Sequence, residues 1–227
     1  MILDVRTHIV RLIARGECDA AAEALADQIE RAPANLALRA TRALALAGAG
    51  RMDEALAEAS LASEEDRDVA YAQWAHALLC IRRRDFRRAL PLARRAVALD
   101  PAEPRHLLTL AWAEAGESRW RDALICLDQA LGFDPELVEA RTLRALILEQ
   151  QERARHASAD FRRLLAREPE NAFARIGETW IELDSDPYAS SPRRTRPALP
   201  THLFHEFARW LRNGMRFLSP RPSGQEQ

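Results

Sequence analysis

The chain has 227 residues, of which 48% are hydrophobic, and its formal net charge is −1. A chain of this length and composition can bury a sizeable core without disulfides. Its near-neutral charge argues against bulk binding to nucleic acid, and because all its cations are arginines, chemistry that needs a lysine amine is excluded.

A fixed spacing of 34 residues runs through most of the chain. Small residues return at this step as Ala21, Ala55, Ala89, Ala123 and Ala157. A later position carries proline in four of five cases and arginine in the other, at Pro33, Arg67, Pro101, Pro135 and Pro169. A period of this length is typical of stacked helix pairs, in which small residues let two helices approach closely and proline ends the second helix. The pattern predicts five units, which are 2–35, 36–69, 70–103, 104–137 and 138–171.

Three further positions repeat with the same period. The first helix of each unit faces its partner through Ile9, Ala43, Ala77, Ala111 and Ala145. The second helix interlocks through Leu25, Ala59, Ala93, Leu127 and Phe161. The turn between them falls at Gly16, Gly50, Arg84, Ser118 and Glu152. The second unit is rich in alanine and lacks the proline, so we expect its helix pair to be the loosest.

The chain changes character after the fifth unit. A helix from Ala172 to Leu183 is expected to cap the array, which then covers residues 2–183. Residues 184–200 are rich in Pro, Arg and Ser and read as a linker. Residues 201–218 return to helical spacing and predict an amphipathic helix, whereas 219–227 should be frayed. The expected contact residues of this tail helix are Phe204, Phe207, Leu211 and Met215.

The repeated alanines and prolines resemble those of the tetratricopeptide repeat (TPR) family over roughly residues 2–183. The resemblance implies an all-α, right-handed solenoid in which the first helix of each unit lines a concave groove. It places on that groove Tyr71, Trp74, Leu78, Leu108, Trp112 and Leu146. An exposed apolar strip of this kind marks an interaction site. The alternative is that Trp74 and Trp112 belong to the core between repeats.

The function that follows is a noncatalytic scaffold or adaptor that holds a peptide or helix of another protein in the groove. A chaperone that shields an apolar client segment is one version, and docking of residues 201–218 onto the array is another. The alternative function is a membrane-peripheral assembly factor. In that case the tail helix would meet a membrane surface through Phe204, Phe207 and Trp210, with arginines on its other side.

No catalytic residue, metal site or cofactor is predicted, because no nucleophile with a base, phosphate loop or carboxylate cluster is present. Cys18, Cys80 and Cys126 lack metal-ligand spacing and are expected to be buried thiols in a reducing cytosol. The chain shows no signal peptide and no apolar run that spans a membrane. We therefore expect a cytoplasmic bacterial protein, peripheral to the inner membrane if the tail binds lipid.

A run of arginines is the one strongly basic stretch in the predicted array. It comprises Arg82, Arg83, Arg84, Arg87, Arg88, Arg94 and Arg95. We expect a solvated convex face whose arginines pair with acids of neighbouring repeats. Phosphate binding is the alternative, because the guanidinium fork matches phosphate geometry.

Overall fold

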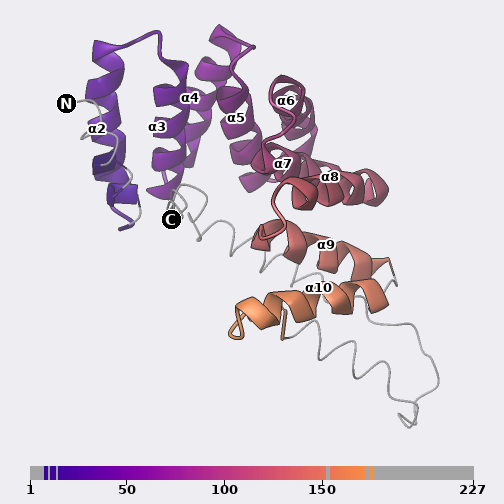
Figure 1. Ribbon diagram of the computed structural model, residues 1–227. Helices are drawn as coiled ribbons and strands as arrows, with labels where there is room; N and C mark the ends of the chain where they lie inside the picture. The colour runs from indigo at the N-terminus through magenta and orange to yellow at the C-terminus, as the bar shows by residue number, and fades with distance from the viewer. Residues whose placement is uncertain (1–7, 10, 14, 152–153, 172–173, 176–227) are drawn as a thin grey trace, which may run out of the picture. The chain divides into compact units, whose positions relative to one another are not determined.

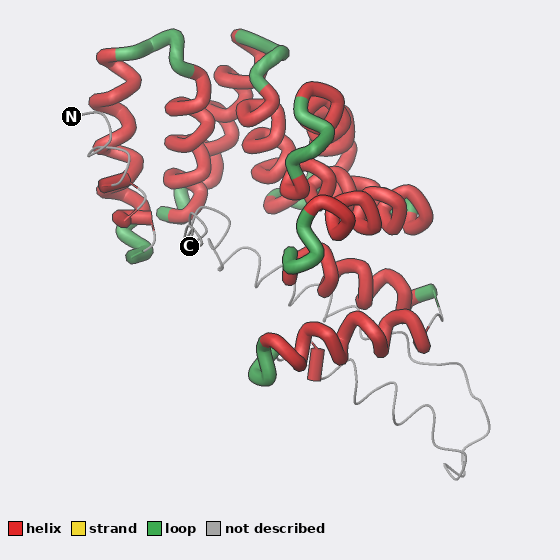
Figure 2. The backbone as a smooth tube through the Cα atoms, viewed as in Figure 1, coloured by secondary structure: helices red, strands yellow, loops and turns green. Residues whose placement is uncertain are grey.

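The computed structural model describes residues 8–175, except 10, 14, 152–153 and 172–173. Within these residues every regular element is a helix, as Figure 1 and Figure 2 show, so the all-α class is confirmed. Of the expected capping helix only Ala174 and Arg175 are described, and both are helical. The predicted linker 184–200, amphipathic helix 201–218 and tail 219–227 lie outside the described residues.

The helices alternate in two series that share one period. Residues 8–13, apart from residue 10, are helical and precede α2. The first helices of the following pairs are α3 (Leu36–Gly48), α5 (Ala70–Arg82), α7 (Pro104–Gly116) and α9 (Val138–Gln150). The second helices are α2 (Cys18–Arg31), α4 (Met52–Glu65), α6 (Phe86–Leu99), α8 (Trp120–Phe133) and α10 (Ala154–Arg167). In each series every helix begins 34 residues after the one before it, and α3, α5, α7 and α9 begin at the predicted unit boundaries.

The described helices form two compact units that divide between Pro101 and Ala102. In the first unit α3 packs against α2, α4 and α5, and α5 packs against α4 and α6. In the second unit α7 packs against α8 and α9, and α9 packs against α8 and α10. A first helix thus contacts its own partner and the next first helix, which is how a helical-repeat core becomes continuous. That residues 2–183 form one uninterrupted array stays a prediction.

Close helix packing follows from the repeated small residues. The alanines of the second helices are all fully buried, namely Ala21, Ala55, Ala89, Ala123 and Ala157. The interlocking residues are also buried, from Leu25 in α2 to Phe161 in α10. Because an alanine side chain ends at Cβ, the two backbones can approach until larger neighbours fill the remaining space.

The turns inside the helix pairs share a left-handed residue. The backbone φ is +79° at Gly16, +85° at Gly50, +63° at Arg84 and +60° at Ser118. The next residue donates its backbone N–H to a carbonyl of the preceding helix, as Arg119 N does to Glu114 O at 2.9 Å. This bond closes the helix end in the manner of a Schellman motif. Two of these places therefore hold a side chain in a conformation that favours glycine.

Replacing Ser118 with glycine should raise the free energy of unfolding by about 0.5–1 kcal/mol, because glycine adopts positive φ without steric cost. The reverse change, Gly50→Ser, should lower it by about 1 kcal/mol, since a Cβ at Gly50 meets no other atom and only the backbone strain changes. Urea denaturation followed by circular dichroism measures both variants. Shifts of the same sign would contradict this assignment of strain.

The second helix pair has helices of the same length as the third. α3 and α4 have 13 and 14 residues, as do α5 and α6, and that this pair is the loosest stays a prediction. Ala43 and Ala59 in this pair are fully buried. After α4 the side chain of Asp66 accepts a hydrogen bond of 2.8 Å from Asp68 N in an Asx turn, and Asp134 forms the same turn beside Pro135 in the fourth repeat.

Candidate functional site

The candidate binding surface on the first unit, the α5 face, consists of Tyr71, Trp74 and Leu78. Their spacing of three and four residues places them on one side of α5. Trp74 lies in the core of the first unit, and Tyr71 and Leu78 pack partly buried against that core. The ring centroids of Tyr71 and Trp74 are 5.2 Å apart with a 38° tilt. The hydroxyl of Tyr71 also forms a 3.4 Å hydrogen bond with that of Thr41 on α3.

The other predicted groove residues do not form an exposed strip. Trp74 is 3% exposed, Leu108 1%, Trp112 6% and Leu146 3%. Their burial contradicts the expected exposure and agrees with the alternative that the two tryptophans are core residues. The physical reason for Trp74 is that small alanines dominate the core around it, so that its indole fills volume that alanines leave empty. A binding role for the predicted groove residues stays a prediction, and only Tyr71 and Leu78 are partly exposed.

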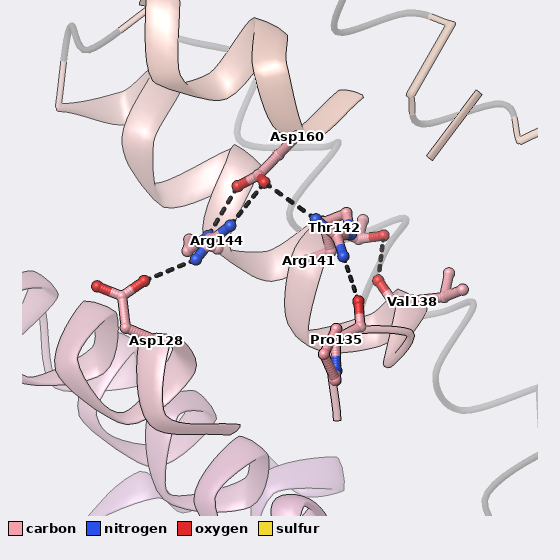
Figure 3. Close-up of polar contacts among 7 residues, drawn as sticks. All are labelled: Asp128, Pro135, Val138, Arg141, Thr142, Arg144 and Asp160. Atoms are coloured by element: carbon pink, nitrogen blue, oxygen red, sulfur yellow. Dashed lines mark hydrogen bonds and ion pairs between the residues drawn. The ribbon is translucent and has the colours of Figure 1, made fainter. Parts of the chain in front are cut away.

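A buried charge network holds the last described helix pair together (Figure 3). Asp160 on α10 has a side chain 4% exposed and accepts hydrogen bonds of 2.8 and 2.7 Å from Nε and Nη2 of Arg144 on α9. Arg144 Nη1 also donates to the exposed Asp128 on α8 at 2.7 Å. Nη1 of Arg141 lies 3.6 Å from Asp160 Oδ1, and its Nη2 donates to the backbone oxygen of Pro135. One buried carboxylate thus orders two arginines from the facing helix.

This network was not predicted from the sequence, although the repeat carries a signal for it. Arg144 and Asp160 are 16 residues apart, and so are Arg42 and Glu58, which form the same ion pair at 3.2 Å in the second repeat. Both pairs occupy equivalent positions of the 34-residue period. Comparison of polar residues across the repeats, in addition to small ones, would have found it.

A second polar cluster, also missed, lies between α4 and α5. Ser63 and Gln73 are each 3% exposed, which is unusual for polar side chains in an alanine-rich core. Gln73 Nε2 donates to Ser63 O at 2.7 Å, and Ser63 Oγ lies 2.8 Å from His76 Nδ1. Ser63 Oγ also donates to Ser60 O at 3.1 Å. The hydroxyl has one proton, so it accepts from His76 Nδ1 while it donates to Ser60 O, and in the other tautomer it donates to Nδ1 instead.

Burial lowers the pKa of His76, with Glu64 acting to raise it and Arg88 to lower it. The unfolded chain therefore takes up the proton first. Above the unfolded pKa of about 6.5 the neutral His76 costs the fold nothing. As the pH falls through that value the free energy of unfolding decreases, and the decrease stops below the folded pKa. We expect His76→Gln to flatten the fall in stability between about pH 7.5 and pH 5.5. Urea midpoints of both proteins across this range measure it, and parallel curves would contradict the shift.

Two arginines of the run form the expected ion pairs with acids of a neighbouring repeat. Arg83 on the α5–α6 turn lies 3.0 Å from Asp53 on α4. Arg95 on α6 lies 2.5 Å from Asp68, which follows α4. These pairs connect neighbouring repeats on an exposed surface, where each contributes little to stability.

The cysteines are buried as expected. Cys18, Cys80 and Cys126 are free thiols, each in a different helix. Burial raises the pKa of Cys80 to about 11, so its reactive thiolate is scarce at neutral pH. Among the described residues no group of three or more His, Cys, Asp or Glu side chains is placed to hold a metal ion.

The expected tail contacts cannot be placed on these helices. Phe204, Phe207, Leu211 and Met215 lie outside the described residues. In the part that is described, no helix is both long enough and apolar enough to cross a membrane. Docking of the tail and its contact with a membrane stay predictions.

No family model matches the sequence, and no curated protein is a significant match. Solved structures do match. The thermophilic TPR protein TTC0263 of Thermus thermophilus is 18% identical, with a TM-score of 0.67 over 81% of this chain and 100% of that one. A TPR protein of Parabacteroides merdae is 17% identical, with a TM-score of 0.61 over 79% of this chain and 72% of that one. MamA of Desulfovibrio magneticus RS-1 is 18% identical, with a TM-score of 0.60 over 74% and 95%. With the 34-residue spacing of the helices, these similarities show that the chain has the tetratricopeptide-repeat fold.

Proposed function

We propose that the protein is a noncatalytic scaffold that holds a peptide or helix of a partner protein against the α5 face. The observation that supports this is the position of Tyr71 and Leu78, which remain partly exposed on the same side of α5 as the buried Trp74. Aromatic and aliphatic side chains fixed in this way are typical anchors of protein interfaces.

The α5 face is ordered before any partner arrives. Trp74 is fixed in the core and contacts the Tyr71 ring, whose hydroxyl also bonds to Thr41. A side chain that is already held in one orientation loses little conformational entropy when it binds, so more of the contact energy appears as affinity. The phenol also offers a polar group beside an apolar surface, which suits the mixed chemistry of an amphipathic segment.

One source of such a segment is the chain's own residues 201–218, whose sequence carries Phe204, Phe207 and Leu211 at helical spacing. If this segment occupies the α5 face, Phe207→Glu combined with Leu211→Glu should strengthen binding of an external peptide, because the competitor is weakened. Unchanged affinity would exclude the tail as the occupant. Co-sedimentation of the same variant with anionic liposomes tests the membrane alternative, which predicts a loss of lipid binding.

Peptides selected from a displayed random library against the full-length chain provide a probe of the α5 face. We expect Leu78→Glu and Tyr71→Ala each to weaken their binding about tenfold or more, which corresponds to about 1.4 kcal/mol. The matched control is Ile125→Glu on α8, where the wild-type side chain is 51% exposed and apolar. Fluorescence anisotropy measures all three. Equal loss in the control, or no loss at Leu78, would place the site elsewhere.

A further inference from the structure

A pocket in the first unit has no role in the proposed function. It opens among α4, α5 and α6 and has a volume of about 500 Å³. We call it the α4–α6 pocket, and it is lined by Ser63, Glu64, Arg67, Gln73, His76, Pro91, Leu92 and Arg95. Sites for small molecules range over roughly 300–1,000 Å³, so the size suits a small organic ligand.

The walls of the pocket combine an apolar side with basic groups. Pro91 and Leu92 of α6 supply the apolar side, and Arg67 and Arg95 supply two exposed guanidinium groups. Arg95 is partly engaged with Asp68, whereas the Arg67 side chain has no acidic partner in the part of the chain that the structure describes. His76 uses Nδ1 to bind Ser63, so Nε2 is the ring nitrogen that a ligand can reach.

An ion pair found in two other repeats is absent at this place, as it is from the first repeat, with His8 and Ala24, and the fourth, with Leu110 and Cys126. In the second and fifth repeats a basic residue of the first helix pairs with a carboxylate of the second helix, as Arg42 with Glu58 and Arg144 with Asp160. In the third repeat the same two positions hold His76 and Leu92, and both line the pocket. His76 thus supplies a nitrogen group at the position of the arginine, whereas Leu92 supplies no carboxylate. The α4–α6 pocket lies beside both residues.

Ser63 departs from the repeat in the same region. The equivalent positions carry apolar residues in every other unit, namely Ile29, Val97, Leu131 and Leu165. Only the second unit places a hydroxyl there, and that hydroxyl oxygen orients His76. Two independent features, the hydroxyl of Ser63 and the missing carboxylate at Leu92, thus meet at one pocket.

We propose that the α4–α6 pocket binds a small organic carboxylate whose acid group takes the place that Glu58 and Asp160 hold in their own repeats. Arg67 and His76 Nε2 would contact the carboxylate, since charge-assisted hydrogen bonds to a carboxylate are stronger than neutral ones. The apolar remainder of the ligand would lie against Pro91 and Leu92. This proposal does not depend on binding at the α5 face.

Binding of such an anion is linked to a proton. The charged groups that face His76 are Glu64 of α4, Arg88 and Arg95 of α6, and Arg67 after α4. Burial lowers the pKa of His76 and so favours its neutral form, whereas a bound carboxylate favours the imidazolium. Affinity should therefore rise as the pH falls from about 8 to about 6, by at most about tenfold per pH unit for one proton.

Isothermal titration of the full-length chain tests the proposal with three probes, namely hexanoate, hexanamide and inorganic phosphate. We expect hexanoate to bind with a dissociation constant on the order of a millimolar, and the uncharged amide and the phosphate to bind far more weakly. The Cε1–H resonance of His76 should shift with hexanoate in the NMR spectrum. Absence of binding, or equal binding of the amide or of phosphate, would overturn the carboxylate assignment.

Variants separate this pocket from the rest of the basic surface. Arg67→Gln should weaken hexanoate about tenfold, as expected for a lost charged hydrogen bond. Arg87→Gln, an exposed arginine of α6 outside the pocket, should leave it unchanged. Leu92→Glu places a carboxylate where Glu58 and Asp160 stand in their repeats, so it should abolish hexanoate binding and raise the pKa of His76 in the NMR titration. Full binding by the Leu92→Glu or Arg67→Gln variant would contradict the proposed site.

Discussion

Replacing Asp160 with alanine should lower the free energy of unfolding by about 3–5 kcal/mol, because it removes the carboxylate that binds Arg144 at two points and that lies beside the largely buried Arg141. Asp160 holds Arg144 through two short hydrogen bonds, and its side chain is 4% exposed. Arg141 lies on the same carboxylate and is itself largely buried. Urea denaturation followed by circular dichroism measures the loss.

Two further variants make this result specific. Asp128 binds the same Arg144 but is 65% exposed, so Asp128→Ala should cost less than about 1 kcal/mol. The triple change Arg141→Leu, Arg144→Leu and Asp160→Cys copies the residues at the equivalent places of the fourth repeat, Leu107, Leu110 and Cys126. This triple variant should regain most of the free energy of unfolding that Asp160→Ala loses, since apolar residues can replace a buried ion pair with little cost. Equal losses for Asp160 and Asp128 would show that burial does not govern the network.

Phe161→Ala should destabilise the fold by about 3–5 kcal/mol, the range for truncating a buried phenylalanine. Phe161 is 0% exposed and occupies the interlocking position of the last repeat, where α9 and α10 meet. The cavity left by its ring would lie between these two helices. Thermal and urea unfolding, with the loss of helical signal as readout, measure the effect.

The matched control is Phe161→Leu. Leucine occupies the same repeat position at Leu25 and Leu127, and both are buried between closed helix pairs. This variant should cost less than about 1.5 kcal/mol, because it keeps most of the buried volume. If the alanine and leucine variants were equally stable, the position would not be a packing contact.

The fold followed from sequence because its determinants repeat. A small residue lets two helices approach closely, and the five alanines one period apart are all fully buried. The turn positions were found even where glycine is absent, since Arg84 and Ser118 adopt the positive φ of Gly16 and Gly50. Spacing alone therefore located the turns when composition did not.

Burial of the groove residues could not be predicted in the same way. The resemblance predicts that Trp74 and Trp112 lie on the groove side of their helices, but it does not say how far neighbouring side chains cover them. That depends on volume. Trp74 belongs to a core cluster that consists largely of alanines, so its indole is buried among small side chains.

The polar sites were not predicted from the sequence because they do not recur in every repeat. Ser63 differs in type from the apolar residues at its equivalent positions, so a search for recurring residues passes over it. A charge pair such as Arg144 and Asp160 recurs in one other repeat, which is too few to stand out from one sequence. The meaning of such residues depends on which of them lie together in space.

Hydrogen–deuterium exchange of the full-length chain, with and without a selected peptide, tests the scaffold proposal most directly. We expect slower exchange in α5 and in α3, which packs against it, and no such protection in the Leu78→Glu variant. Protection confined to α8 around Ile125, or protection that persists in the Leu78→Glu variant, would contradict it.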